Sequence, residues 1–230
     1  MTVHVREWGS GDRHAVLIHG LGNSSTSWWE LGPELARRGY HVHAVDLPGH
    51  GDSVRLDKYS VEALVDAVVA AVPDSPELAL GHSLGGLVLA HAVKALQPAH
   101  AVYVDPAWRV TADAGVVDFF RSQKKWTLDD VAKNFPKWDV ASHERKLEAL
   151  QKWDPAILDG LGSFTSADVD VPIVPSTVVL ADPSNLIAPA RAAELTEAGF
   201  DVRVVPGTGH VVHIDDFAGF LDALKVVISE

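Results

Sequence analysis

Residues 81–85 read Gly-His-Ser-Leu-Gly, and their types and spacing have the clearest chemical meaning in the chain. An apolar run over 77–80 predicts a strand before them, and another over 84–96 predicts a helix after them. Gly-X-Ser-X-Gly between a strand and a helix is typical of a nucleophile elbow, a tight turn that lifts the serine hydroxyl off the sheet. The two glycines leave room where strand and helix nearly touch. We therefore expect Ser83 to be a nucleophile.

A serine hydroxyl is a poor nucleophile at neutral pH and needs a base that takes its proton. Residues 206–210, Pro-Gly-Thr-Gly-His, follow a strand predicted over 202–205. A histidine in a glycine-rich loop after a late strand is placed where it can reach over the serine. We expect His210 to be this base, with His213 as the competing candidate. The other histidines are expected to have structural roles.

The oxygen that becomes negative during acyl transfer needs hydrogen-bond donors. The amide of Leu84 follows the serine and begins the predicted helix, where free N–H groups and the helix dipole favour negative charge. The loop after a strand predicted over 15–19 is rich in glycine, which allows close approach of the backbone. We expect the amide of Leu21 to be the second donor, with the amide of Gly22 as the alternative.

Strand-like runs alternate with helical patterns along most of the chain. Such alternation predicts an α/β fold, in which a mostly parallel sheet of about seven strands has helices on both faces. Strands are predicted over 3–8, 15–19, 41–46, 77–80, 101–105, 177–181 and 202–205, and helices over 28–38, 61–72, 84–96 and 217–228.

Residues 107–165 break this alternation, because they contain no convincing strand and more than half of the chain's tryptophan and phenylalanine residues. We expect them to form a helical lid, inserted into a core made of 1–106 and 166–230. Some of the aromatic side chains would form the lid's own core, and others would line an apolar substrate pocket. The candidates for substrate binding are Trp28, Trp108, Phe119, Trp126 and Trp138.

Composition limits the possible functions of the 230-residue chain. A formal net charge of -12 disfavours binding to nucleic acid or to an anionic membrane. The absence of cysteine excludes a thiol nucleophile and a thiolate metal site. The sequence contains neither an apolar run long enough to span a membrane nor an apolar signal segment at its start, so we expect a cytoplasmic protein. No spacing typical of a metal or nucleotide site is present, and we expect no cofactor.

Four motifs in this order resemble the α/β-hydrolase superfamily, in particular its lidded, esterase-like members. They are His-Gly at 19–20, Asp-Leu-Pro-Gly-His-Gly-Asp-Ser at 46–53, the serine motif at 81–85 and Gly-Thr-Gly-His at 207–210. The resemblance covers nearly the whole chain. It implies a Ser, acid, His order along the sequence, an active site at the carboxyl ends of the strands and a lid in the place of the inserted helical segment.

The acid departs from the pattern that the resemblance implies. Similar enzymes carry it after the penultimate strand, often as an Asp four residues before a Pro, but this position before Pro189 is Asn185. A carboxylate stands three residues earlier, at Asp182. An acid after the preceding strand is also known in the superfamily, and Asp105 has that place. We expect Asp182 to complete the triad, with Asp105 as the alternative acid and the neutral Asn185 as a third candidate.

The serine motif and the resemblance together predict a serine hydrolase that works through an acyl-enzyme. Its expected partner is a small hydrophobic ester, or a related amide, carbamate or lactone. One alternative is a carbon–carbon bond hydrolase of aromatic ring-cleavage products, which uses the same triad. The other is a non-catalytic protein that binds a small ligand on the same scaffold, and the missing Asp at position 185 favours this alternative.

Overall fold

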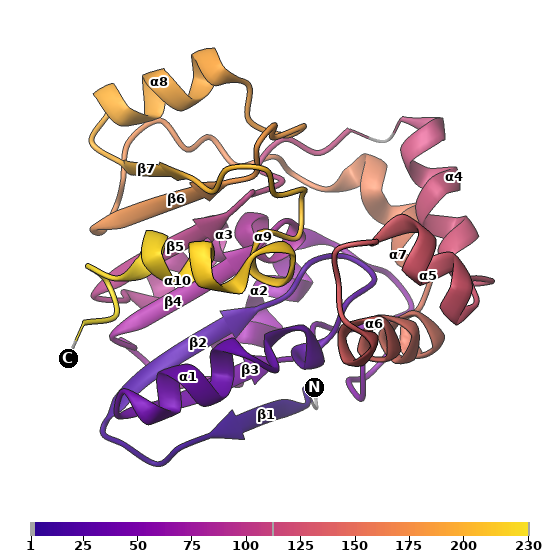
Figure 1. Ribbon diagram of the computed structural model, residues 1–230, viewed down its shortest axis with the longest axis horizontal. Helices are drawn as coiled ribbons and strands as arrows, with labels where there is room; N and C mark the ends of the chain where they lie inside the picture. Colours follow the sequence, from indigo (N-terminus) through magenta and orange to yellow (C-terminus); the bar gives the residue numbers. More distant parts are fainter. Residues whose placement is uncertain (1–2, 112, 230) are drawn as a thin grey trace.

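The computed structural model describes residues 3–111 and 113–229, and it contains one seven-stranded sheet (Figure 1). The strand order is β1-β3-β2-β4-β5-β6-β7, and only the β1–β3 pair is antiparallel. The prediction of a mostly parallel α/β sheet is therefore confirmed. The strands are β1 (Val5–Trp8), β2 (Arg13–Ile18), β3 (Tyr40–Val45), β4 (Leu78–His82), β5 (His100–Val104), β6 (Ser176–Leu180) and β7 (Asp201–Val204).

Two apolar clusters cover the two faces of the sheet. In β2, Ala15 and Leu17 belong to one cluster, whereas Val16 and Ile18 belong to the other. This division follows from the alternation of side chains along a strand, and it explains why the central strands read as continuous apolar runs. The helices outside the inserted segment are α1 (Leu31–Arg37), α2 (Val61–Val69), α3 (Leu84–Leu96), α8 (Pro189–Glu197), α9 (Val212–Asp215) and α10 (Phe217–Leu224), with the short η1 (Ser25–Trp28).

The segment between β5 and β6 is helical, as its sequence predicts. Side chains cap three of its helices: Asp113 accepts from two amides of α4, Thr127 forms a capping box on α5, and Asp139 caps α6. Figure 1 shows α4 to α7 gathered beyond the carboxyl ends of the parallel strands. The helices are α4 (Ala114–Gln123), α5 (Leu128–Asn134), α6 (Val140–Lys152), α7 (Ile157–Gly160) and η2 (Leu161–Ser163).

The inserted helices share the core of the sheet. Trp153 and Ile157 have no exposed surface and pack in the same apolar cluster as Leu87 of α3. Burial of large apolar side chains is the main contribution to stability in such a cluster. The segment is thus held firmly at one end of the molecule, and a lid with bounds at 107 and 165 stays a prediction.

Candidate active site

Ser83 lies at the sharp turn between β4 and α3. Its backbone has φ +52° and ψ -116°, a left-handed conformation that is uncommon for a residue with a side chain. A Cβ atom on Gly81 would overlap the backbone of Gly85, and one on Gly85 would overlap the carbonyl oxygen of Ile18. The cramped turn therefore requires glycine on both sides of the serine, as the sequence motif predicts. Strain of this kind is typical of functional sites.

The His210 side chain lies between Ser83 and a buried carboxylate. Its Nε2 is 2.8 Å from the Ser83 Oγ, and its Nδ1 is 2.6 Å from an Oδ of Asp105. A carboxylate can only accept, so the Nδ1–H donates to Asp105 and Nε2 remains free to accept the serine proton. Asp105 has no exposed surface, and the amide of Ala181 lies 3.4 Å from its other oxygen. The geometry is that of a nucleophile, a base and an orienting acid.

The placement of Asp182 differs from our expectation. Its carboxylate is exposed and accepts a hydrogen bond of 3.4 Å from the amide of Gly207, whereas Asp105 contacts His210. The sheet order explains the difference: Asp105 follows β5, the immediate neighbour of β4, while Asp182 follows β6, one strand farther from the serine. Asn185, the third candidate, lines a cavity beside the serine, while the two His210 ring nitrogens contact Asp105 and Ser83.

Two further histidines surround His210 and are uncharged. His82 donates from Nε2 to the carbonyl oxygen of His210 at 2.9 Å, and burial holds its pKa well below the ordinary value. His213, the competing base, is stacked on Trp28 with 4.3 Å between ring centroids, and burial lowers its pKa to about 3. His82 thus fixes the loop that carries His210, while His213 belongs to the packing beneath that loop.

A second pair of buried histidines shapes the loop that contains Leu21. His19 donates from Nδ1 to the carbonyl oxygen of Gly20 at 2.8 Å, and His50 accepts from the amide of Gly22 at 3.2 Å. Burial lowers the pKa of His19 to about 4 and that of His50 to about 3. Both rings are therefore neutral near pH 7, and both hold backbone groups on either side of Leu21.

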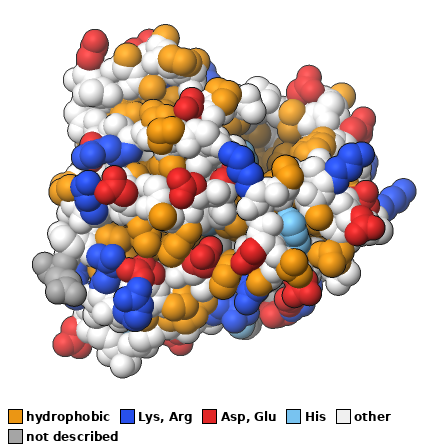
Figure 2. All heavy atoms as spheres, viewed as in Figure 1, with side chains coloured by type: hydrophobic (Ala, Val, Ile, Leu, Met, Phe, Trp, Pro, Cys, Tyr) orange, Lys and Arg blue, Asp and Glu red, His pale blue; other side chains and the backbone are white. Residues whose placement is uncertain are grey.

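Two cavities meet at Ser83 and His210, which line both of them. The larger, of about 290 Å³, is mainly apolar and also reaches Leu21 and Leu84, the residues predicted to supply the oxyanion donors. Leu84 is the first residue of α3, so its N–H has no acceptor within the helix. In Figure 2, hydrophobic side chains line a hollow beside α4. The donor roles of the two amides stay predictions.

The smaller cavity, of about 190 Å³, is lined by aromatic side chains and, apart from Ser83 and the histidines, by three polar ones. The polar side chains come from the loop after β2 and from α4 and α6 of the inserted segment. They are Asn23, Gln123 and Lys146.

Of the five aromatic residues predicted to bind substrate, Phe119 lines the smaller cavity. The other four line neither of the two cavities beside Ser83. Trp28 is fully buried in the core, and Trp108 packs edge-on against Tyr103. Trp28 packs in the same apolar cluster as Leu31 and Leu35, and Trp108 packs in the cluster that contains Tyr103, so both are core residues.

The remaining two tryptophans hold the inserted segment together. Trp126 packs edge-on against Phe119, and Trp138 stacks on Phe135 and donates to Asp215 at 2.6 Å. An indole N–H that needs a partner favours such a bridging position.

The sequence analysis missed several lining residues on α4. Val116 and Phe120 line the larger cavity, and Phe120 and Gln123 line the smaller one. Their spacing of four and three residues puts them on one face of a helix. That periodicity is a signal in the sequence from which these residues can be found.

Among the described residues, two groups of side chains have the types and proximity needed to hold a metal ion. In the first, the ligand atoms of His14, His41 and His43 all lie within 4.8 Å of one another. These histidines lie near the amino ends of β2 and β3, the opposite end of the sheet from Ser83. The second group consists of His4, Asp46 and Asp52, in which Asp46 also accepts from the amides of Ser25 and Asp52.

Comparison with known proteins agrees with this architecture. Residues 15–223 match the profile of the Alpha/beta hydrolase family. The chain belongs to this family. A pimeloyl-[acyl-carrier protein] methyl ester esterase from Aeromonas hydrophila is 44% identical over 90 residues, which are 38% of this chain and 34% of that protein. The matched part is thus about a third of the length of such curated relatives.

Solved structures of the family share the fold over nearly the whole chain. An N-formylmaleamic acid deformylase from Pseudomonas putida S16 has a TM-score of 0.81 at 24% identity, with 97% of this chain and 95% of that chain covered. An esterase from Exiguobacterium antarcticum has a TM-score of 0.80 at 15% identity, with 99% and 96% covered. The chain thus shares its fold with these two enzymes. None of its described helices has the length and hydropathy required to cross a bilayer.

Proposed function

We propose that this family member is a serine hydrolase that cleaves small hydrophobic esters or related amides, carbamates and lactones. The observation that carries the proposal is the continuous line of contacts from Ser83 through His210 to Asp105, at 2.8 and 2.6 Å. A serine with a purely structural role would not require a base and a buried acid in line with its hydroxyl group. The esterases among the relatives and structural neighbours support the same class of reaction.

The reaction follows from the positions of these groups. His210 Nε2 takes the proton of Ser83 while the serine oxygen attacks the substrate carbonyl. Asp105 keeps the imidazole in the right tautomer and stabilises the positive charge that forms on the ring. The amides of Leu84 and Leu21 are proposed to hold the negative oxygen. His210 then gives the proton to the leaving alcohol, and the acyl group remains on the serine.

Water completes the reaction in a second, similar step. His210 removes a proton from the water while its oxygen attacks the acyl-enzyme, and the returning proton frees Ser83 and the acid product. The ring is partly exposed, with 37% of its side-chain surface accessible, so water can reach it. We further propose that the inserted helices act as a lid over this site, because α4 contributes side chains to both cavities.

The size and lining of the larger cavity suit a small, apolar substrate group. Its volume of about 290 Å³ and its aliphatic and aromatic lining suit a short acyl chain or a small ring. Arg109 is the charged residue among its lining side chains, and it is exposed.

The two alternatives are not equally supported. A carbon–carbon bond hydrolase uses the same three groups and remains the second candidate function. The non-catalytic binding protein was favoured by the missing acid at position 185. Since Asp105 supplies a buried carboxylate to His210, that observation no longer favours it.

Labelling with a fluorophosphonate probe tests the proposal. We expect rapid, stoichiometric modification of the wild-type protein and none of the Ser83→Ala variant. Ser122→Ala is the matched control, because Ser122 is an exposed serine that lines neither cavity. A panel of 4-nitrophenyl esters beside a vinylogous diketone then separates ester hydrolysis from carbon–carbon cleavage. An unlabelled wild-type protein would refute the proposed function.

A further inference from the structure

Lys146 is a buried cation that the proposed reaction does not use. It lies on α6, is 7% exposed, and lines the smaller cavity together with Ser83 and His210. Its Nζ donates to the carbonyl oxygen of Gly22 and to the side-chain oxygen of Asn23, both at 2.9 Å. An ammonium group has three N–H donors, so one donor remains after these two bonds.

No carboxylate in the described ranges, 3–111 and 113–229, forms an ion pair with this ammonium group. Buried charges in proteins are usually paired, because removal from water is costly. Burial lowers the pKa of Lys146 to about 7. The titratable side chains that interact with it are His19, His50 and His82, and burial keeps all three neutral. Within the part of the chain that the structure describes, the positive charge therefore has no counter-charge.

A second polar side chain that lines this cavity has a buried atom without a hydrogen-bond partner among the described residues. Gln123, at the end of α4, is 3% exposed, and its Oε1 forms no hydrogen bond within the described part of the chain. A Cβ atom placed on Gly22 would lie 3.7 Å from this oxygen and 3.7 Å from the Lys146 Nζ. Both groups thus approach the same small region beside the loop after β2. Unsatisfied buried polar atoms are uncommon and indicate a missing partner.

We propose that Lys146 and Gln123 bind a carboxylate carried by the substrate, so that the preferred substrates are half-esters or half-amides of small dicarboxylic acids. The inference rests on the proposed function, since it assigns a substrate class to the same site. The free N–H of Lys146 would donate to one carboxylate oxygen. The carboxamide of Gln123 can rotate about its broad terminal torsion and donate an N–H to the other. The scissile carbonyl would then lie at Ser83, which lines the same cavity.

The test compares monomethyl glutarate with methyl pentanoate, which has the same chain length without the second carboxylate. We expect the wild-type protein to have the higher kcat/KM for the half-ester, through a lower KM. In Lys146→Met this preference should fall about 10- to 100-fold, the amount expected for a hydrogen bond to a charged group. The ratio of the two substrates is the readout, because a disturbance of the loop that Lys146 holds affects both esters alike. Lys146→Arg should recover part of the preference.

Lys124→Met is the matched control. Lys124 also belongs to the inserted segment and donates to three backbone carbonyl oxygens, but it lines neither cavity. Its loss should leave the ratio of the two substrates unchanged. If Lys146→Met instead lowers kcat equally for both esters, Lys146 only supports the loop after β2 and the inference is wrong. A wild-type protein that prefers methyl pentanoate also overturns it.

A pH series gives an independent readout. Because Lys146 loses its proton above about pH 7, KM for the half-ester should rise with pH relative to KM for methyl pentanoate. Groups that act on both substrates alike cancel in the ratio.

Direct binding separates failure of this inference from failure of the proposed function. Calorimetric titration of Ser83→Ala with monomethyl glutarate needs no turnover, and binding should weaken about 10-fold or more in the Ser83→Ala, Lys146→Met double variant. Absence of binding to Ser83→Ala would contradict the carboxylate site even where fluorophosphonate labels the wild-type serine.

Discussion

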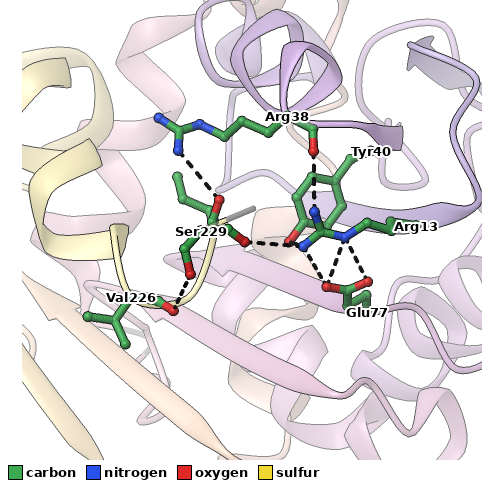
Figure 3. A network of polar contacts seen from close by, with 7 residues as sticks. Arg13, Arg38, Tyr40, Glu77, Val226 and Ser229 are labelled. Carbon is green, nitrogen blue, oxygen red and sulfur yellow. Dashed lines mark hydrogen bonds and ion pairs between the residues drawn. The ribbon is translucent and has the colours of Figure 1, made fainter.

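The two ends of the parallel sheet differ in whether their charged groups are paired. At the amino ends of the strands, the Arg13 guanidinium donates to both oxygens of Glu77 and to the hydroxyl of Tyr40 (Figure 3). At the carboxyl ends, Lys146 is buried without a carboxylate partner among the described residues, and Ser83 has a strained backbone. At the amino ends, the groups form a closed network of hydrogen bonds with one another. At the carboxyl ends, polar groups remain available.

This difference indicates where the chain uses its charged groups for stability and where it uses them for chemistry. Paired and hydrogen-bonded charges hold strands together, and in Figure 3 the network reaches the carbonyl oxygen of Ser229. Perturbed, unpaired titratable groups in a cavity are typical of functional sites. Variants at the carboxyl end should therefore change activity first, and variants at the amino end should change stability alone.

The largest effect is expected from Ser83→Ala. Removing the nucleophile should lower kcat for an ester substrate by about 10⁴- to 10⁶-fold, because the remaining groups cannot form an acyl-enzyme. Steady-state kinetics with a 4-nitrophenyl ester measures the loss. The free energy of unfolding should stay the same or increase. Among the described residues, the Ser83 hydroxyl has no structural hydrogen bond to lose other than the one to His210. Activity retained near the wild-type level would contradict the nucleophile assignment.

The second effect decides between the two acids. Asp105→Asn should lower kcat by about 10⁴-fold, because an amide can leave His210 in the wrong tautomer and cannot stabilise its charge. Asp182→Asn should change kcat by less than about threefold, because the exposed Asp182 carboxylate accepts a long backbone hydrogen bond and does not contact His210 in the described structure. The same ester assay measures both variants, with circular dichroism as the check on folding. The reverse order of losses would restore Asp182 as the acid.

The sequence predicts the sheet and the elbow well because both depend on local patterns. Apolar runs and the glycines around Ser83 can be recognised within a few residues, and their packing follows from strand and helix geometry. The choice of acid depends instead on strand order, which places Asp105 beside β4 and Asp182 farther away. Order in a sheet is a long-range property, and the local signal of an Asp before a Pro is the same at both positions.

The substrate-binding residues were harder to predict for a related reason. An aromatic residue in the inserted segment can pack inward or line a cavity, and composition does not distinguish the two. Trp108 packs on β5 and Phe119 lines the smaller cavity, although both lie in the same aromatic-rich segment. Lys146 appears in the sequence as an ordinary helix lysine. Its burial depends on the loop after β2, more than a hundred residues away.

The third effect is a pH dependence of stability from the unpaired lysine. The pKa of Lys146 is about 7 in the folded protein and 10.5 without burial, so the unfolded chain binds more protons between these values. The free energy of unfolding of the wild type should therefore rise with pH in this window.

Lys146→Met removes that titration and provides the comparison. Relative to this variant, the wild type should gain on the order of 2 kcal/mol between about pH 6 and about pH 9, as measured by urea unfolding. Other titrating groups are common to both proteins and cancel in the difference. A pH-independent difference would show that the ammonium group is solvated or paired in the folded state.

The smallest effect is expected at the closed network. Arg13→Met should lower the free energy of unfolding by about 1 kcal/mol, since the pair is partly exposed, with side-chain exposures of 31% for Arg13 and 42% for Glu77. The Arg13 hydrogen bonds hold the pKa of Glu77 below its ordinary value. Their contribution is therefore present above the unfolded pKa of Glu77 and is lost as the pH falls through its folded pKa.

Activity provides the decisive part of this last comparison. Arg13 contacts Tyr40, Glu77 and the carbonyl oxygen of Arg38, all at the amino ends of the strands, so kcat/KM of Arg13→Met should equal that of the wild type. Glu77→Gln should reproduce the loss of stability without changing activity. If either variant altered kcat/KM at a temperature where it is fully folded, the two ends of the sheet would be coupled, and the division of charge between stability and chemistry would not hold.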